Sequence, residues 1–168
     1  DGRTAIPVLE ARIGENKLTG AISFTPDFKP DGTIDFNLPD LGLLAAMAGQ
    51  KASGDLNGSA AIKTTNGITS VVVKAGGSGI KRDALTIAKP TADITISDVA
   101  ALAIKGSVRA ETIAQGPNRV AGLAVDFQQQ QAGRTGFSID GKYDGGPLTA
   151  KGDLTSAKGR TEIRLASF

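Results

Sequence analysis

The chain has 168 residues, a formal charge of +2, and neither cysteine nor histidine. These absences exclude disulfides and thiolate chemistry, and they remove the side chain most often used as proton shuttle and metal ligand. Scattered lysine and arginine with few aromatic residues argue against nucleic-acid binding, which needs a basic stripe and stacking rings. The length fits one β-rich, repeat-like domain over residues 1–168, and the start at Asp1 leads us to expect an excised piece of a longer protein.

Strands are the predicted elements along almost the whole chain, beginning with residues 5–13. Residues 17–24 (KLTGAISF) and 33–39 (TIDFNLP) alternate apolar and polar side chains, and a Pro-Asp-Gly turn lies between them. Residues 55–64 and 69–75 flank Asn66-Gly67, which is a strong signal for a two-residue hairpin turn. We therefore expect two β-hairpins in the first half of the chain.

A short helix is predicted between these hairpins, in the stretch DLGLLAAMAG. Asp40 is a suitable N-cap and Gly49 a suitable stop. Leu41, Leu44 and Ala48 share one helical face. We expect this helix to cover one end of the sheet, and the alternative is a gate over a lipid path.

The second half continues with strands that carry glycine at an apolar position. In LAIKGSVRAE, Gly106 stands between Ile104 and Val108 on the apolar side, where a glycine offers nothing to pack. Repetition of this apolar-x-Gly-x-apolar unit favours an elongated stack of strands. Further alternating runs, which bring the total to about ten or twelve strands, lie at residues 84–88, 92–97, 102–111, 122–127, 136–143, 147–154 and 161–167.

These features predict an all-β fold: a single curved sheet of about 10–12 strands, shaped like a half-pipe or taco, with an apolar concave face and one short helix. A closed β-sandwich is the alternative, because an apolar sheet face must be covered by a second sheet, by its own curl or by a ligand. Glycine and alanine at many apolar positions would fill a sandwich core poorly. The side chains expected to line the concave groove are Leu18, Ile22, Phe24, Ile34, Phe36, Leu38, Leu56, Ile62, Val71, Val73, Leu85, Ile87, Ile94, Ile96, Leu102, Ile104, Val108, Leu123, Val125, Phe127, Phe137, Ile139, Leu154, Ile163 and Leu165.

No pattern of residues predicts a catalytic, cofactor or metal site, so we expect no enzyme. Residues 75–83 (AGGSGIKRD) lack the Gly-Lys-Ser/Thr ending of a P-loop and are interpreted as a glycine turn between strands. Asp27, Asp31 and Asp35 lack the spacing of a calcium loop, which favours solvated turn carboxylates over a weak external calcium contact. Residues 128–131 (QQQQ) are interpreted as a polar turn. Without histidine the common serine triad cannot be built, and nothing marks out a Ser–Lys pair.

Residues 38–62 resemble the TamB family, the inner-membrane component of the translocation and assembly module, which has AsmA-like relatives. The likeness rests on a short Leu/Ala-rich helix followed by a G-x-L-x-G strand, here Gly54, Leu56 and Gly58. The stretches AIKGSVRAE and PLTAKGDLTS are similar to the repeating strand unit of that family.

This resemblance implies a periplasmic segment of an inner-membrane-anchored protein in a Gram-negative envelope. It implies a taco-shaped sheet lined by apolar side chains, and movement of phospholipid towards the outer membrane. It also implies a role in outer-membrane protein assembly, with a TamA-like barrel partner and outer-membrane client proteins. No catalytic residue and no cofactor are carried over.

The sequence leaves three functions open. The first is a lipid-binding or lipid-conducting segment whose groove takes phospholipid or detergent acyl chains. The second is a structural docking module that templates client β-strands along its sheet edges, without lipid transport. The third is an extracellular adhesin with a filled core, and an enzyme ranks last.

Overall fold

The fold is all-β with one short helix. It is described from a computed structural model, which covers residues 2, 4–131, 133–157 and 160–167. The elements in chain order are β1 (Thr4–Ile13), β2 (Asn16–Phe24), β3 (Pro30–Leu38), α1 (Leu41–Met47), β4 (Ser53–Gly54), β5 (Leu56–Thr65), β6 (Ile68–Gly76), β7 (Gly79–Arg82), β8 (Leu85–Ala88), β9 (Thr91–Asp98), β10 (Ala103–Gln115), β11 (Asn118–Gln131), β12 (Arg134–Tyr143), β13 (Gly146–Ala157) and β14 (Arg160–Ser167).

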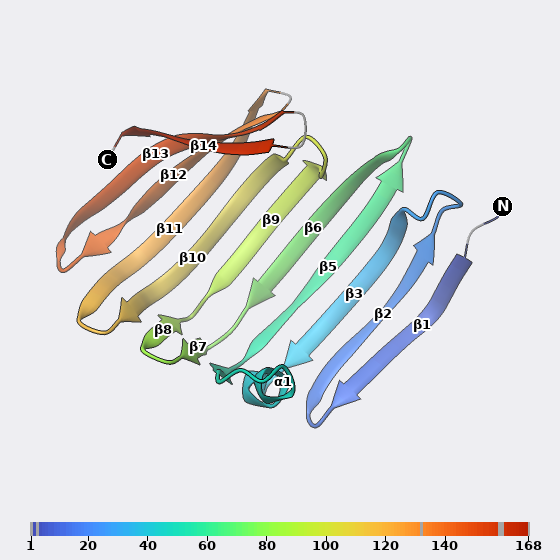
Figure 1. Cartoon of the computed structure of the whole chain (residues 1–168), viewed down its shortest axis with the longest axis horizontal. Helices are drawn as coiled ribbons and strands as arrows, with labels where there is room; N and C mark the ends of the chain where they lie inside the picture. The colour runs from blue at the N-terminus through green and yellow to red at the C-terminus, as the bar shows by residue number, and fades with distance from the viewer. Residues whose placement is uncertain (1, 3, 132, 158–159, 168) are drawn as a thin grey trace.

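All the strands belong to one curved antiparallel sheet that does not close on itself. Its main path runs β1-β2-β3-β5-β6-β9-β10-β11-β12-β13-β14, so β1 and β14 lie at opposite edges (Figure 1). The described residues form this one sheet and no second layer, which confirms the curved single sheet and excludes the β-sandwich.

The sheet has fourteen strands, more than the ten to twelve expected. The additional ones are short: β4 has two residues and β7 has four, which is too few for an alternating pattern to be recognised. Together with β8 they form a flap beside α1, in which β4 pairs with β7, β7 with β8, and β8 with β10 (Figure 1).

Two predicted turns are confirmed and a third is misplaced. β2 and β3 pair as the expected antiparallel hairpin, but Pro30, Asp31 and Gly32, expected to form its turn, are the first residues of β3. The turn is residues 25–29, closed by a hydrogen bond from the Thr25 amide to the Lys29 carbonyl. β5 and β6 are joined at Asn66 and Gly67, whose φ angles of 51° and 79° are typical of a type I′ turn. Within the glycine-rich stretch at residues 75–83, Gly77 and Ser78 connect β6 to β7.

The predicted helix is confirmed as α1, which lies at one end of the sheet (Figure 1). The Asp40 carboxylate caps it by accepting a hydrogen bond from the Leu43 amide at 3.1 Å. Asn16 of β2, only 3% exposed, fixes the helix start, because its side chain donates to the Asp40 carbonyl and accepts from the Asp40 amide. No residue of α1 is buried, so the helix borders the sheet without entering a core. At seven residues it is far too short to cross a bilayer, and the described part of the chain holds no helix that is long and apolar enough to do so.

One face of the sheet carries apolar side chains from β1 to β14. Residues directly opposite each other in antiparallel strands share a face. Register therefore aligns one unbroken row across the eleven strands of the main path. This central row is Leu9, Gly20, Ile34, Ala60, Val73, Ile94, Gly106, Phe127, Phe137, Gly152 and Leu165.

Strand β11 changes phase at Gly122, where φ is 60°. Val120 and Val125 are an odd number of residues apart, yet they lie opposite Tyr143 and Ile139, which share one face of β12. The irregular register beside Gly122 thus keeps both valines on the apolar face.

The same change of phase carries Leu85 and Ile87 to the apolar face. Ile113 of β10 lies opposite both Val120 and Ile87, so these three side chains share a face. Lys89, between β8 and β9, has a φ of 45°. Ile87 before it and Ala92 after it are an odd number of residues apart, yet both lie on the apolar face.

Two sequence expectations are wrong in this region. Leu102, expected on a strand, lies in the turn of residues 99–102 with a φ of 49°, and β10 begins at Ala103. Residues 128–131, expected to form a turn, are the last part of β11, because glutamine has none of the backbone preferences that start a turn.

Glycine in the central row allows neighbouring strands to approach closely. At Gly106 φ is 131°, and an added Cβ would collide with the Asp93 carbonyl oxygen of the adjacent strand. At Gly152 an added Cβ would collide with the Arg164 carbonyl oxygen and with the Phe137 ring, which therefore covers this glycine. Both positions let the sheet bend, and at Gly152 an aromatic ring fills the space that the missing side chain leaves.

We expect Gly106→Ala to lower the free energy of unfolding by about 1–3 kcal/mol, because the new methyl strains a backbone that L residues rarely adopt. Urea denaturation measures the change. Gly76→Ala is the control, since a Cβ there meets nothing nearer than 3.6 Å, and we expect a change within about 0.5 kcal/mol. Equal stability of the two variants would contradict this role of Gly106.

Candidate functional site

The side chains expected to line a groove gather on the apolar face, apart from Leu102 in its turn. Most of them are only half-buried, whereas a two-layer core would bury them. Phe137 is the one buried member, and Val108, Leu165 and Ile163 are 38%, 55% and 67% exposed. The apolar face is therefore a broad surface from which water is only partly excluded.

Sequence reasoning missed several members of this face. The β1 residues Ile6, Leu9 and Ile13 belong to it, as do Ile80 of β7, Ile113 of β10 and Val120 of β11. Ile113 and Val120 lie beyond the change of phase, where simple alternation from the middle of the strand predicts the opposite face. Ile80 lies on β7, which is too short for a pattern to be recognised.

The β9–β10 turn folds over one end of the apolar face. Thr135 of β12 is completely buried, and its hydroxyl donates a hydrogen bond to the Leu102 carbonyl at 2.7 Å and accepts one from the Ile104 amide at 3.2 Å. On β13 the Ser156 hydroxyl donates to the Ala100 carbonyl at 3.4 Å. Two polar side chains thus hold this turn across the ends of β12 and β13.

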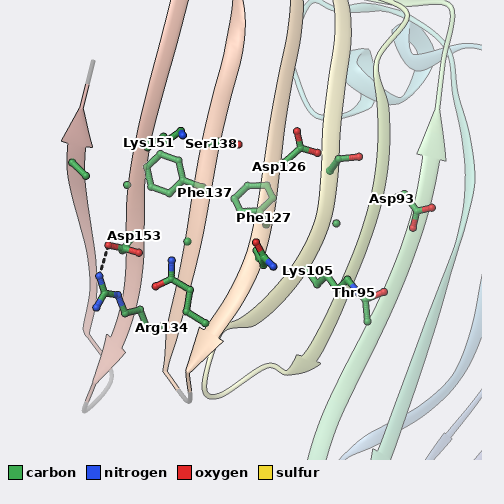
Figure 2. A pocket seen from close by; sticks show the side chains of 17 residues that line it. Asp93, Thr95, Lys105, Asp126, Phe127, Arg134, Phe137, Ser138, Lys151 and Asp153 are labelled. Carbon is green, nitrogen blue, oxygen red and sulfur yellow. Dashed lines mark hydrogen bonds and ion pairs between the residues drawn. The ribbon is translucent and has the colours of Figure 1, made fainter.

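The opposite, polar face has a hollow of about 1000 Å³ that the sequence did not lead us to expect (Figure 2). It extends from β9 to β14. One of its walls is a row of directly opposed polar side chains, which are Asp93, Ser107, Asp126, Ser138 and Lys151.

Four residues of the central row also border the hollow. They are Gly106, Phe127, Phe137 and Gly152, although alternation places their side-chain positions on the other face. Gly136 removes a side chain from the polar face at the same place. Glycine in three of the strands, β10, β12 and β13, therefore leaves few side-chain atoms here.

The glutamine stretch contributes to this hollow. Because these residues continue β11, Gln128 and Gln130 point to the polar face and line it. Gln129 points the other way and accepts a hydrogen bond from the Ser97 hydroxyl at 3.3 Å. The signal in the sequence was the unbroken alternation from Val125 onward, since no glycine or proline interrupts it before Gly133.

An ion pair closes one end of the hollow. The guanidinium of Arg134 lies 2.6 Å from a carboxylate oxygen of Asp153, which is 17% exposed (Figure 2). The hydrogen bond from Arg134 lowers the pKa of Asp153 below its ordinary value, and it raises the pKa of Arg134.

The aspartates near the first hairpin are separated by their elements. Asp27 lies in the turn, where its carboxylate accepts a hydrogen bond from Thr25 and pairs with Lys29 at 3.0 Å. Asp31 and Asp35 lie on β3, opposite Ser23 and Thr19. Within the described ranges no three carboxylates are placed to hold a metal ion together.

No family model, no curated protein and no solved structure matches the chain. Its function is therefore inferred from the two faces of the sheet. The apolar face offers area whose central row has no hydrogen-bonding side chain. The polar hollow offers charges, hydroxyls and amides. The first arrangement suits aliphatic chains, and the second suits polar, charged molecules.

We expect Thr135→Val, which keeps the shape of the side chain, to lower the free energy of unfolding by about 1–3 kcal/mol, since the Leu102 carbonyl and the Ile104 amide lose their partner. Chemical denaturation measures this. Thr33→Val, on the exposed face of β3, is the control and should change the value by no more than about 0.5 kcal/mol. A Thr135 variant as stable as the control would show that the turn is held without this hydroxyl.

A pH dependence follows from the lowered pKa of Asp153. A carboxyl whose pKa is lower in the folded state stabilises the fold above its unfolded pKa, and this contribution is lost as the pH falls through the folded value. We expect the melting temperature of the wild type to exceed that of Asp153→Asn at pH 7, and the difference to shrink below about pH 4. Thermal melts between pH 2 and pH 7, with Arg134→Gln as a second variant that removes the same effect, measure it. Parallel pH profiles in all three proteins would exclude a stabilising ion pair.

Proposed function

We propose that the apolar face binds lipid acyl chains, and that the chain is a lipid-binding or lipid-conducting segment of a longer envelope protein. The observation that carries this proposal is the central row, which is apolar or glycine in every one of the eleven strands of the main path, and in which only Phe137 and Gly152 are buried. A ligand that covers such a row must itself be long and aliphatic.

The dimensions support an acyl chain as this ligand. Ten strand intervals of about 4.8 Å give a row roughly 48 Å long. One lipid leaflet contributes about 15 Å of hydrocarbon, which is half of a bilayer core. The row therefore has room for successive positions of an acyl chain along its length.

The energetics support movement as well as binding. Each methylene removed from water gains about 0.8 kcal/mol, and a chain in a bilayer has already made this gain. Transfer onto an apolar face is thus close to neutral, which is what exchange with a membrane requires. Neighbouring strands present similar aliphatic side chains, so no single position holds the chain strongly.

The resemblance to the TamB family supports a cellular location for this lipid-binding function. We place the chain in the periplasm, as a segment of an inner-membrane-anchored protein that passes phospholipid towards the outer membrane. In this proposal a TamA-like barrel is the partner, and outer-membrane proteins are clients. The short helix beside β4 and the glycine-bearing strands are the features of the fold that fit the family.

Edge augmentation is the second candidate function, and the open edges of the sheet favour it. β1 and β14 are the ends of the strand order, so each has one side on which another strand can add. In this alternative, client strands bind along an edge and the apolar face takes no lipid.

Lipid capture distinguishes these candidates, and β6 offers a matched pair of variants. Val73 lies in the central row, whereas its neighbour Val72 lies on the polar face and is 37% exposed. We expect Val73→Asp and Val108→Asp to reduce capture of a photoactivatable phospholipid at least tenfold, because each puts a charge where the acyl chain lies. Val72→Asp should leave capture unchanged.

Circular dichroism is the control for folding. All three variants must retain the β-sheet spectrum, so that a loss of lipid capture does not reflect unfolding. Equal crosslinking in the Val72 and Val73 variants would refute the acyl-chain site. Binding of a client peptide by the Val73 variant, with no lipid captured by the wild type, would support the second candidate in its place.

A further inference from the structure

The polar hollow has the size of a small-molecule site. Its volume of about 1000 Å³ is at the upper end of the usual range for ligand pockets. It lies on the opposite side of the sheet from the central row, so an acyl chain on the apolar face does not fill it. A molecule bound in the hollow would therefore be separate from the acyl chain.

The carboxylates of the hollow are already neutralised by neighbouring cations. Asp153 pairs with Arg134 at 2.6 Å and Asp126 with Arg109 at 2.9 Å. Asp93 lies 3.8 Å from the ammonium group of Lys74. Arg109 and Lys74 are not among the residues that line the hollow. Because they pair with Asp126 and Asp93, these two carboxylates do not need a cation from the lining as a partner.

Two further cations line the hollow without such partners. Lys105 comes from β10 and Lys151 from β13, and in the part of the chain that the structure describes neither forms an ion pair. Three strand intervals separate the two backbones, which is roughly 14 Å. An anion in the hollow can gain a charge-assisted contact to either lysine without displacing a carboxylate.

The residues between these lysines are hydroxyls and amides. Ser107 and Ser138 are half-buried, and Gln128 and Gln130 are exposed on the same face. These groups both donate and accept hydrogen bonds, which matches the hydroxyls of a sugar. A bare phosphate is too small to contact both lysines across this distance.

We infer that this hollow binds a phosphorylated saccharide, whose phosphate pairs with one of Lys105 and Lys151 and whose hydroxyls contact the other lysine, the serines and the glutamines. Such a group occurs as a free sugar phosphate and as the headgroup of a glycolipid. The site is independent of the acyl-chain proposal, because its side chains point to the other face of the sheet.

Titration of the whole chain with trehalose 6-phosphate tests the inference, by calorimetry and by amide NMR shifts. We expect shifts centred on β10 to β13. Lys105→Gln with Lys151→Gln should weaken binding roughly tenfold or more, since the charge-assisted contact to the phosphate and a second lysine contact to the sugar are lost. Lys63→Gln with Lys142→Gln is the matched control, because both lysines are exposed on the same polar face outside this hollow, and its affinity should be unchanged.

Three results would overturn the inference. Unphosphorylated trehalose binding as tightly would exclude the role of the lysines, and inorganic phosphate binding as tightly would exclude the saccharide. An equal loss in both double variants would reduce the effect to general electrostatics.

Vesicles distinguish the two sources of the ligand. Phosphatidylcholine vesicles with monophosphoryl lipid A present the phosphorylated disaccharide on a membrane. Stronger flotation with these than with pure phosphatidylcholine, lost in the Lys105/Lys151 variant, assigns the site to a glycolipid headgroup. Binding of trehalose 6-phosphate without this gain assigns it to a free sugar phosphate. The Val73→Asp variant should bind trehalose 6-phosphate normally, so failure of one site is distinguishable from failure of the other.

Discussion

The hydrogen-bonded register between strands holds this fold together, because a single layer leaves few side chains for a core. Among the residues that the structure describes, the buried apolar ones are Ala103, Ala110, Phe137 and Ala150, and three of these four are small. A slip of one residue in any strand would move its apolar side chains to the other face. Correct pairing is therefore the condition for both surfaces that the sheet presents.

Two backbone positions with positive φ angles keep apolar side chains on one face where the sequence pattern changes. Gly122 on β11 and Lys89 before β9 have positive φ angles where the apolar pattern of the sequence slips by one residue. Without these changes of phase, Ile87 and Ile113 would face the polar side. The apolar face extends to the flap beside α1 because several neighbouring strands change phase at the same level.

Most of the fold was predictable from local patterns. Alternation located the long strands, Asn66-Gly67 located the β5–β6 hairpin, and Asp40 located the start of α1. The Pro-Asp-Gly stretch indicated the β2–β3 hairpin but lies within β3, because the turn precedes it. The short strands β4 and β7 and the phase changes were not predictable, because each depends on pairing between distant residues. The polar hollow was missed for the same reason: its walls come from six strands, and no single stretch carries its pattern.

The linear order of the strands gives the molecule an uneven resistance to opening. Along the main path each strand contacts little besides its two neighbours, as in a solenoid. Stability then accumulates as a chain of interfaces, and the outermost strands have only one each. Fraying accordingly begins at β1 and β14 and advances inward, so amide protons near β6 and β9 exchange last with solvent. The middle of the sheet can remain ordered while its two margins open.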